Sequence, residues 1–155
     1  MAALNLVDLG STEVKWQEIT LKDFLKAKDK LLRKNYGNGK TVFLRGTNAG
    51  GYLVQEFWMC STQHSSGVNC EMDIYRTLTS RFGEAKMREL VNLYQDNYWT
   101  EIDFDNCAKI GMNCIRLPIW YMNLVDFEGN LLNNAFDRID WFVKEAGKRG
   151  IYVIL

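Results

Sequence analysis

The last five residues of the chain, 151–155, form a continuous apolar run with the sequence IYVIL. A strand that is apolar at successive positions, instead of alternate ones, is typical of a strand covered on both faces. Such strands occur in parallel sheets and barrels, where a helix leads from one strand to the next. The run therefore predicts an α/β fold, and it predicts that the chain is the first part of a larger protein.

Changes in hydrophobic period place further strands and helices along the chain. Residues 41–48 and 112–118 are rich in apolar and β-branched residues and are predicted to be core strands. Residues 71–82 and the stretch after Gly83 have apolar residues three and four apart, which predicts two consecutive helices. The apolar residues expected on their buried faces are Ile74, Tyr75, Leu78, Phe82, Met87, Leu90, Val91 and Tyr94.

Two more helices have recognisable ends. Thr100 and Asp103 form a capping pair for one helix, which Gly111 ends. Asn133 or Asn134 is expected to cap the other, which leads into the terminal run and completes a strand-helix-strand unit. The residues expected on the buried face of this last helix are Phe136, Ile139, Val143 and Ala146.

The segment before residue 41 has two readings. The apolar residues of 21–32 have helical spacing, whereas the sequence YGNGK at 36–40 is a turn signal typical of a hairpin. The residues alone leave this choice open.

Charge and composition narrow the choice of partners. Lys and Arg balance Asp and Glu at 19 each, so we expect no nucleic acid or membrane partner. No stretch is long and apolar enough to span a bilayer, and no signal peptide follows Met1. Five tryptophans can serve core packing, and they also suit a flat, uncharged ligand such as a sugar ring.

The cysteines and glycines argue against three other kinds of site. Cys60, His64 and Cys70 could bind zinc, but their spacing fits no standard finger, and we expect no metal site. Cys60 and Cys70 are more simply free thiols, or a pair if the protein is exported. Gly50 and Gly51 follow the first core strand in a pattern that matches neither a dinucleotide-binding fingerprint nor a phosphate-binding loop. We therefore expect no cofactor.

Three separated motifs carry a family resemblance. They are LRGTNAGGYLVQEFW at 44–58, GMNCIRLPIWY at 111–121 and AGKRGIYVIL at 146–155. Together they resemble glycoside hydrolase family 5, the cellulase and β-glucanase family of (β/α)8 barrels. The LVQEFW motif, with the helical insertion around Gly83, is similar to the branch that contains exo-β-1,3-glucanases.

This resemblance implies an incomplete (β/α)8 TIM barrel with about the first three strands and an N-terminal hairpin. Residues 1–20 would be an extension, and residues 21–155 the first part of the catalytic domain. It also implies short strands within 24–46, in favour of the hairpin reading. Proteins of this family are commonly secreted, which is the localisation that the resemblance suggests.

The resemblance also implies a reaction. Retaining glycoside hydrolysis uses one carboxylate as nucleophile and a second as acid and base. In the family these are glutamates that end the fourth and seventh strands, beyond the third strand that this chain reaches. The chain is thus expected to be an inactive part of a hydrolase that acts on β-glucans of the cellulose or β-1,3 type. A non-catalytic carbohydrate-binding or interaction fragment is the alternative.

Six residues are candidates for the supporting site. Arg116 lies inside an apolar strand, where a charge requires a partner, and the resemblance implies that it orients the nucleophilic glutamate. In the glucanase branch of the family, the position that Glu56 matches forms hydrogen bonds with sugar hydroxyls. Asn48 is expected to orient Glu56 or Arg116. Trp58, Trp120 and Tyr121 are expected to stack against sugar rings, although packing under a loop explains each aromatic residue equally well. We also expect the isolated chain to self-associate through its incomplete sheet.

Overall fold

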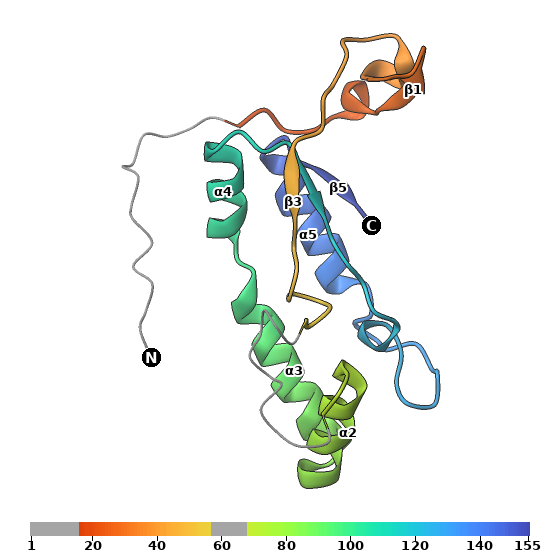
Figure 1. Cartoon of the computed structure of the whole chain (residues 1–155), viewed down its shortest axis with the longest axis vertical. Helices are drawn as coiled ribbons and strands as arrows, with labels where there is room; N and C mark the ends of the chain where they lie inside the picture. The colour runs from red at the N-terminus through yellow and green to blue at the C-terminus, as the bar shows by residue number, and fades with distance from the viewer. Residues whose placement is uncertain (1–15, 57–67) are drawn as a thin grey trace.

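The structure is a computed structural model that describes residues 16–56 and 68–155. Its centre is a three-stranded parallel sheet in the order β3-β4-β5 (Figure 1). Among the described residues, three α-helices lie between the first two strands and one between the last two. The predicted strand-helix-strand unit is thus confirmed. The elements are, in chain order, β3 (Gly46–Asn48), α2 (Glu71–Phe82), α3 (Glu84–Tyr98), α4 (Glu101–Lys109), β4 (Cys114–Arg116), η3 (Tyr121–Asn123), α5 (Asp137–Lys148) and β5 (Tyr152–Ile154).

The helices before β4 begin and end where the sequence predicts. Gly83 separates α2 from α3 with a φ of 81°, a left-handed conformation that favours glycine. At α4, the Asp103 carboxylate accepts hydrogen bonds from the backbone and the hydroxyl of Thr100, at 2.7 and 2.9 Å. The capping pair is therefore confirmed. Phe82, however, is 56% exposed, so its predicted place on a buried face is wrong.

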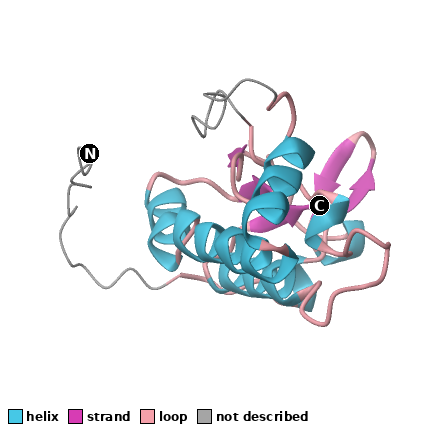
Figure 2. Cartoon of the chain, turned by 90° about the horizontal axis from the view of Figure 1, so that it is seen from below, coloured by secondary structure: helices cyan, strands magenta, loops and turns pink. Residues whose placement is uncertain are grey.

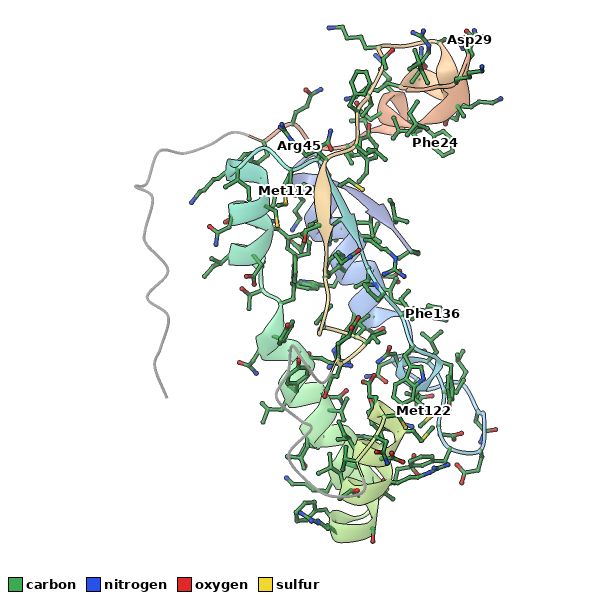
Figure 3. All side chains as sticks on the ribbon, viewed as in Figure 1. Phe24, Asp29, Arg45, Met112, Met122 and Phe136 are labelled. Atoms are coloured by element: carbon green, nitrogen blue, oxygen red, sulfur yellow. The ribbon has the colours of Figure 1, made fainter. Side chains whose placement is uncertain are left out.

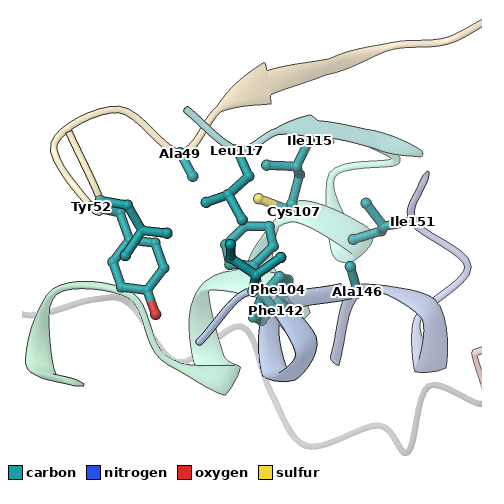
Figure 4. Close-up of a cluster of buried hydrophobic side chains, with 11 residues drawn as sticks. Ala49, Tyr52, Phe104, Cys107, Ile115, Leu117, Phe142, Ala146 and Ile151 are labelled. Atoms are coloured by element: carbon teal, nitrogen blue, oxygen red, sulfur yellow. The ribbon is translucent and has the colours of Figure 1, made fainter. Parts of the chain in front are cut away.

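Helices α4 and α5 pack against the sheet through an aromatic core. Phe104 of α4 and Phe142 of α5 have ring centroids 4.7 Å apart and are fully buried. They contact Ile115 and Leu117, which frame the end of β4 and are also fully buried (Figure 4). Seen from below, most of the helical mass lies to one side of the strands (Figure 2). The hydrophobic core therefore lies between these helices and one face of the sheet.

The start of α5 differs from the prediction. Phe136 occupies the N-cap position, without a side-chain cap, and Asn134 contributes only its backbone carbonyl to the Asp137 N–H. Phe136 is 50% exposed and points outward (Figure 3), and Val143 is exposed as well. The predicted cap and two positions of the predicted stripe are therefore wrong. The buried stripe starts three residues later, at Ile139, and the residues that continue it are Phe142 and Ala146.

The terminal run is buried only at its start. Ile151 is 1% exposed, whereas Ile154 and Leu155 are 46% and 69% exposed. The prediction that both faces are covered is thus wrong for the chain as described. In the described residues β5 pairs only with β4, and no helix covers its second face.

An antiparallel hairpin precedes the sheet. Strands β1 (Lys26–Lys28) and β2 (Leu31–Arg33) pair across Asp29 and Lys30, which have φ values of 52° and 64°. Two left-handed residues in a two-residue loop are typical of a hairpin turn. A hairpin is therefore present, as one reading predicts, and the helical spacing of 21–32 is misleading, but its turn lies before the predicted turn signal at 36–40. A second reversal, through η2 (Asn35–Gly37), pairs β2 with Thr41 by an isolated bridge.

The hairpin is tied to β5 through Asp23, at the end of η1 (Leu21–Asp23). The Tyr152 hydroxyl donates a hydrogen bond to the carbonyl oxygen of Asp23 at 2.8 Å. The Asp23 carboxylate accepts a hydrogen bond from Lys34 at 2.6 Å, which lowers its pKa to about 2. These contacts hold the hairpin beside the sheet, at the end of the molecule where Phe24 and Asp29 lie (Figure 3).

No helix that the structure describes is long and apolar enough to cross a membrane.

We expect Gly46→Ala to destabilise the sheet severely. A Cβ atom at Gly46 would lie 1.6 Å from the carbonyl oxygen of Cys114, its register partner in β4. Because backbone atoms cannot move away without breaking the strand pair, we expect a loss of about 3 kcal/mol or more in the free energy of unfolding. Denaturation with urea, followed by circular dichroism, measures this loss.

Gly147→Ala is the matched control. Gly147 lies inside α5, and a Cβ atom there meets nothing within 4 Å. Alanine is favoured over glycine by about 1 kcal/mol in a helix, so we expect equal or greater stability. Equal effects of the two substitutions would contradict the close approach of β3 and β4.

Candidate functional site

The carboxyl ends of the three parallel strands form one edge of the sheet. Asn48, Arg116 and Ile154 are register partners across this edge. The backbone continues the pairing, because the Ala49 N–H donates to the Arg116 carbonyl and the Leu117 N–H donates to the Ile154 carbonyl, both at 2.8 Å. The backbones of Asn48 and Arg116 thus lie side by side at this edge. Ligands of open α/β folds bind at such strand ends.

Arg116 lies on the face of the sheet opposite the helices. Side chains alternate along β4, so Ile115 and Leu117 point into the core while Arg116 points away and is exposed. Among residues 16–56 and 68–155, no ion pair involves Arg116. The expected burial of this charge is therefore wrong here, because no described segment covers its face of the sheet.

The loop after β3 carries Glu56 and is held from behind by α3. The hydroxyls of Tyr94 and Tyr98 donate hydrogen bonds to the carbonyls of Gly51 and Gly50, at 2.6 and 3.0 Å. Two loop side chains, Tyr52 and Leu53, are almost fully buried. Glu56 follows this anchored stretch and is exposed. The loop thus has a fixed course as far as the residues that precede Glu56.

Glu71 is a functional candidate that the sequence reasoning missed. One of its carboxylate oxygens, Oε2, accepts a hydrogen bond from the Gln55 N–H at 3.1 Å, next to Glu56. The other oxygen, Oε1, is buried and has no partner among the described residues. Burial raises the pKa of Glu71 to about 7. An acidic residue that begins a helix normally interacts with the helix dipole at the surface, so no local signal indicated this burial.

The predicted aromatic residues differ in their surroundings. Trp120 is partly buried and packs edge-on against Tyr75, with ring centroids 5.1 Å apart, in a second core between α2 and α3. Met122 is a buried member of that core (Figure 3). Tyr121 is 55% exposed, so it offers the open ring that a sugar needs. Trp58 lies outside the described residues.

The cysteines do not form a metal site in the described part of the chain. Cys60 and His64 lie outside the described residues, and Cys70 is an exposed free thiol. Among the described residues, no group of three potential ligands could hold a metal ion. Cys107 and Cys114 are buried, and burial raises the pKa of both thiols. Both therefore act as small core residues.

The side chains at the sheet edge can form hydrogen bonds with a hydroxyl-rich ligand. Arg116 and Asn48 supply hydrogen-bond donors, Asn48 also supplies an acceptor, and Tyr121 supplies an exposed ring beyond the end of β4.

Comparison with known proteins gives a consistent class. No family model matches the sequence. A probable glucan 1,3-beta-glucosidase A of Aspergillus niger is 28% identical over 117 residues, which are 75% of this chain and 28% of that protein. Its namesake in Aspergillus fumigatus is 31% identical over 112 residues, 67% of this chain and 26% of that protein. A beta-xylosidase of Phanerodontia chrysosporium is 28% identical over 120 residues, 76% of this chain and 24% of that protein.

All three names denote enzymes that cleave glycosides, so the relatives point to a glycoside hydrolase. The sequence prediction is confirmed at this level. The chain spans about a quarter of the length of these relatives.

We expect Glu71→Gln to stabilise the chain above pH 7 and to have little effect near pH 4. The pKa of Glu71 is about 7 in the folded chain and near the ordinary 4.5 in the unfolded chain. Between these values the folded chain binds the extra proton, so the free energy of unfolding falls as pH rises through this window. Glutamine cannot ionise and keeps an acceptor for the Gln55 N–H.

The expected gain at pH 8 is on the order of 1 kcal/mol, since partial exposure screens the charge. Urea denaturation of both proteins at pH 4 and pH 8 measures it. Glu89→Gln is the control, because Glu89 is an exposed glutamate on α3. A gain that does not change with pH would show that the Glu71 carboxyl is not the titrating group.

Proposed function

We propose that the chain is the N-terminal part of a retaining glycoside hydrolase of the family 5 type, which acts on β-glucans and folds as a (β/α)8 barrel. The observation that carries this proposal is the set of register partners at the sheet edge, with Asn48 beside Arg116. The relatives named as glucan 1,3-beta-glucosidases support β-1,3-glucan as substrate.

The arrangement of the sheet supports the barrel. Three parallel strands follow one another in chain order, with helices in the crossovers. A barrel interior is a sheet face that no helix covers, and its chemistry lies at the carboxyl ends of the strands. The face that bears Arg116 has both properties within the described chain.

The proposed roles follow from position. Arg116 holds the nucleophilic glutamate ionised and oriented through charge-assisted hydrogen bonds. Glu56 bonds sugar hydroxyls, and Asn48 orients the Arg116 side chain beside it. Tyr121 contributes an exposed ring to the cleft, next to the partly buried Trp120. The role proposed for Trp58 rests on the family resemblance alone. Both catalytic glutamates belong to strands after β5, so the 155 residues alone do not hydrolyse glycosides.

The decisive experiment is to read the source gene beyond the codon for Leu155 and to assay the longer protein on laminarin. We expect a glutamate at the end of the fourth strand, another at the end of the seventh, and hydrolysis with retention of configuration. Arg116→Ala is expected to lower kcat/KM about 100-fold or more, the scale for loss of a group that stabilises charge in an active site.

Arg81→Ala is the control, since Arg81 is an exposed arginine in α2 and is expected to leave kcat/KM unchanged. A longer protein that cleaves no glycoside, or one in which the two arginine variants behave alike, would refute the proposed role. Glucan binding without hydrolysis would instead favour a non-catalytic carbohydrate-binding protein.

We expect the 155-residue chain alone to self-associate. Leu44 and Ile154 lie in one apolar groove with Phe24, and all three are at least 38% exposed. Exposed apolar surface beside an unpaired strand edge favours association. Ile154→Lys is expected to shift the chain toward monomer in sedimentation velocity, whereas Phe82→Lys, at an exposed position of α2, is not. A monomeric unmodified chain would contradict this expectation.

A further inference from the structure

The hairpin region differs in charge from the rest of the chain. Residues 22–45 contain eight of the 19 Lys and Arg but only two of the 19 Asp and Glu. This segment therefore has a net charge of +6, and the remaining residues have a net charge of −6. The expectation of no membrane partner rests on the balanced charge of the whole chain, which hides this separation.

Neighbouring acids do not neutralise the charges on the hairpin. Lys26 of β1 and Arg33 of β2 are register partners, and like charges at opposite positions destabilise a strand pair. Among residues 16–56 and 68–155, no ion pair involves Lys26, Lys28 or Arg33. Lys28 instead donates a hydrogen bond to the neutral Oδ1 of Asn38 at 3.4 Å. The positive charge of the hairpin is therefore available to a partner outside the chain.

Protection of a sheet edge explains only part of this charge. Within the described chain, β1 pairs only with β2, and lysines on an edge strand discourage pairing with other chains. This accounts for Lys26 and Lys28. Arg33, however, lies in β2, between β1 on one side and a bridge to Thr41 on the other. Its charge opposite Lys26 does not protect an edge, so it points to an anionic partner.

Exposed aromatic side chains lie among these charges. The rings of Phe24 and Tyr36 stack with centroids 4.7 Å apart, and the two residues are 54% and 49% exposed. Gly37, which follows Tyr36, lies against the lysines, since a Cβ atom there would be 3.5 Å from Cβ of Lys26 and 3.7 Å from Cβ of Lys28. Exposed rings beside lysines are typical of surfaces that bind an anionic membrane, where the rings enter the interface and the lysines meet the headgroups.

The shape of this region favours a flat partner. The hairpin projects from one end of the molecule, and its turn at Asp29 lies far from the helices (Figures 1 and 3). A projecting unit can touch a flat surface, whereas single-stranded nucleic acids follow grooves. Residues 22–45 also contain six lysines and only two arginines, and arginine is the residue suited to bidentate phosphate contacts. A flat anionic surface therefore fits better than a nucleic acid.

We propose that residues 22–45 dock on the surface of an anionic membrane, with the lysines at the lipid headgroups and the Tyr36 ring at the interface. Binding of this kind needs no membrane-spanning helix. The hairpin precedes β3 and lies at the amino ends of the parallel strands, so the strand-end edge that bears Arg116 faces away from the membrane. The proposal does not depend on the hydrolase activity.

The test is flotation of the 155-residue chain with vesicles in a density gradient, in which aggregated chain sinks. We expect the chain to float with vesicles of equal parts phosphatidylcholine and phosphatidylserine, and not with phosphatidylcholine alone. The double variant Lys26→Gln, Lys28→Gln is expected to weaken binding about 25-fold, or about fivefold for each charge. Lys109→Gln with Lys144→Gln is the control, because it removes the same charge from exposed positions of α4 and α5.

Tyr36→Asn distinguishes a membrane from a soluble polyanion. Asparagine tolerates the left-handed backbone of this position, where φ is 53°, so the variant removes the ring and keeps the turn. We expect several-fold weaker binding to the anionic vesicles, and unchanged binding would overturn the membrane as partner. Absence of flotation with anionic vesicles, or equal losses in the two lysine double variants, would also overturn the proposal. Hydrolysis of laminarin by the longer protein is a separate readout, so either proposal can fail while the other stands.

Discussion

Two crossovers of the same hand determine the arrangement of this molecule. Parallel neighbours need a long connection, and such connections are right-handed. Because β3, β4 and β5 follow one another across the sheet, both crossovers place their helices on the same face. The core of Phe104 and Phe142 is therefore on that face, and Arg116 and Ile154 are left exposed on the other. The bare face is a consequence of topology and not of weak packing.

The sequence predicts those elements whose ends are determined locally. Gly83 and the Thr100–Asp103 pair set helix ends through contacts within a few residues, and the structure has both. The predicted cap of α5 is wrong because Asn134 contributes only its backbone carbonyl, although asparagine is a residue type that often caps helices. The hairpin is ambiguous in sequence because apolar residues at helical spacing compete with a turn signal at 36–40. Its actual turn lies earlier, at Asp29 and Lys30, whose positive φ values no local signal predicts.

In the candidate site, too, some features follow from local sequence and others depend on segments that are distant in sequence. Asn48 and Arg116 each end a predicted strand, and parallel register then makes them neighbours. Burial is decided by segments distant in sequence, so the exposure of Arg116 and the packing of Trp120 against Tyr75 do not follow from local pattern. Glu71 was missed for the same reason, because its surroundings come from the loop after β3.

The loop after β3 runs from the buried core to the exposed strand-end edge of the sheet. Tyr52 is buried in the core with Phe142, on the helical side of the sheet, and Glu56 follows four residues later in the exposed part of the same loop. Between them the Gln55 N–H is held by the buried Glu71 carboxylate. The backbone that leads to Glu56 is therefore held by contacts with α2 and α3 behind the loop.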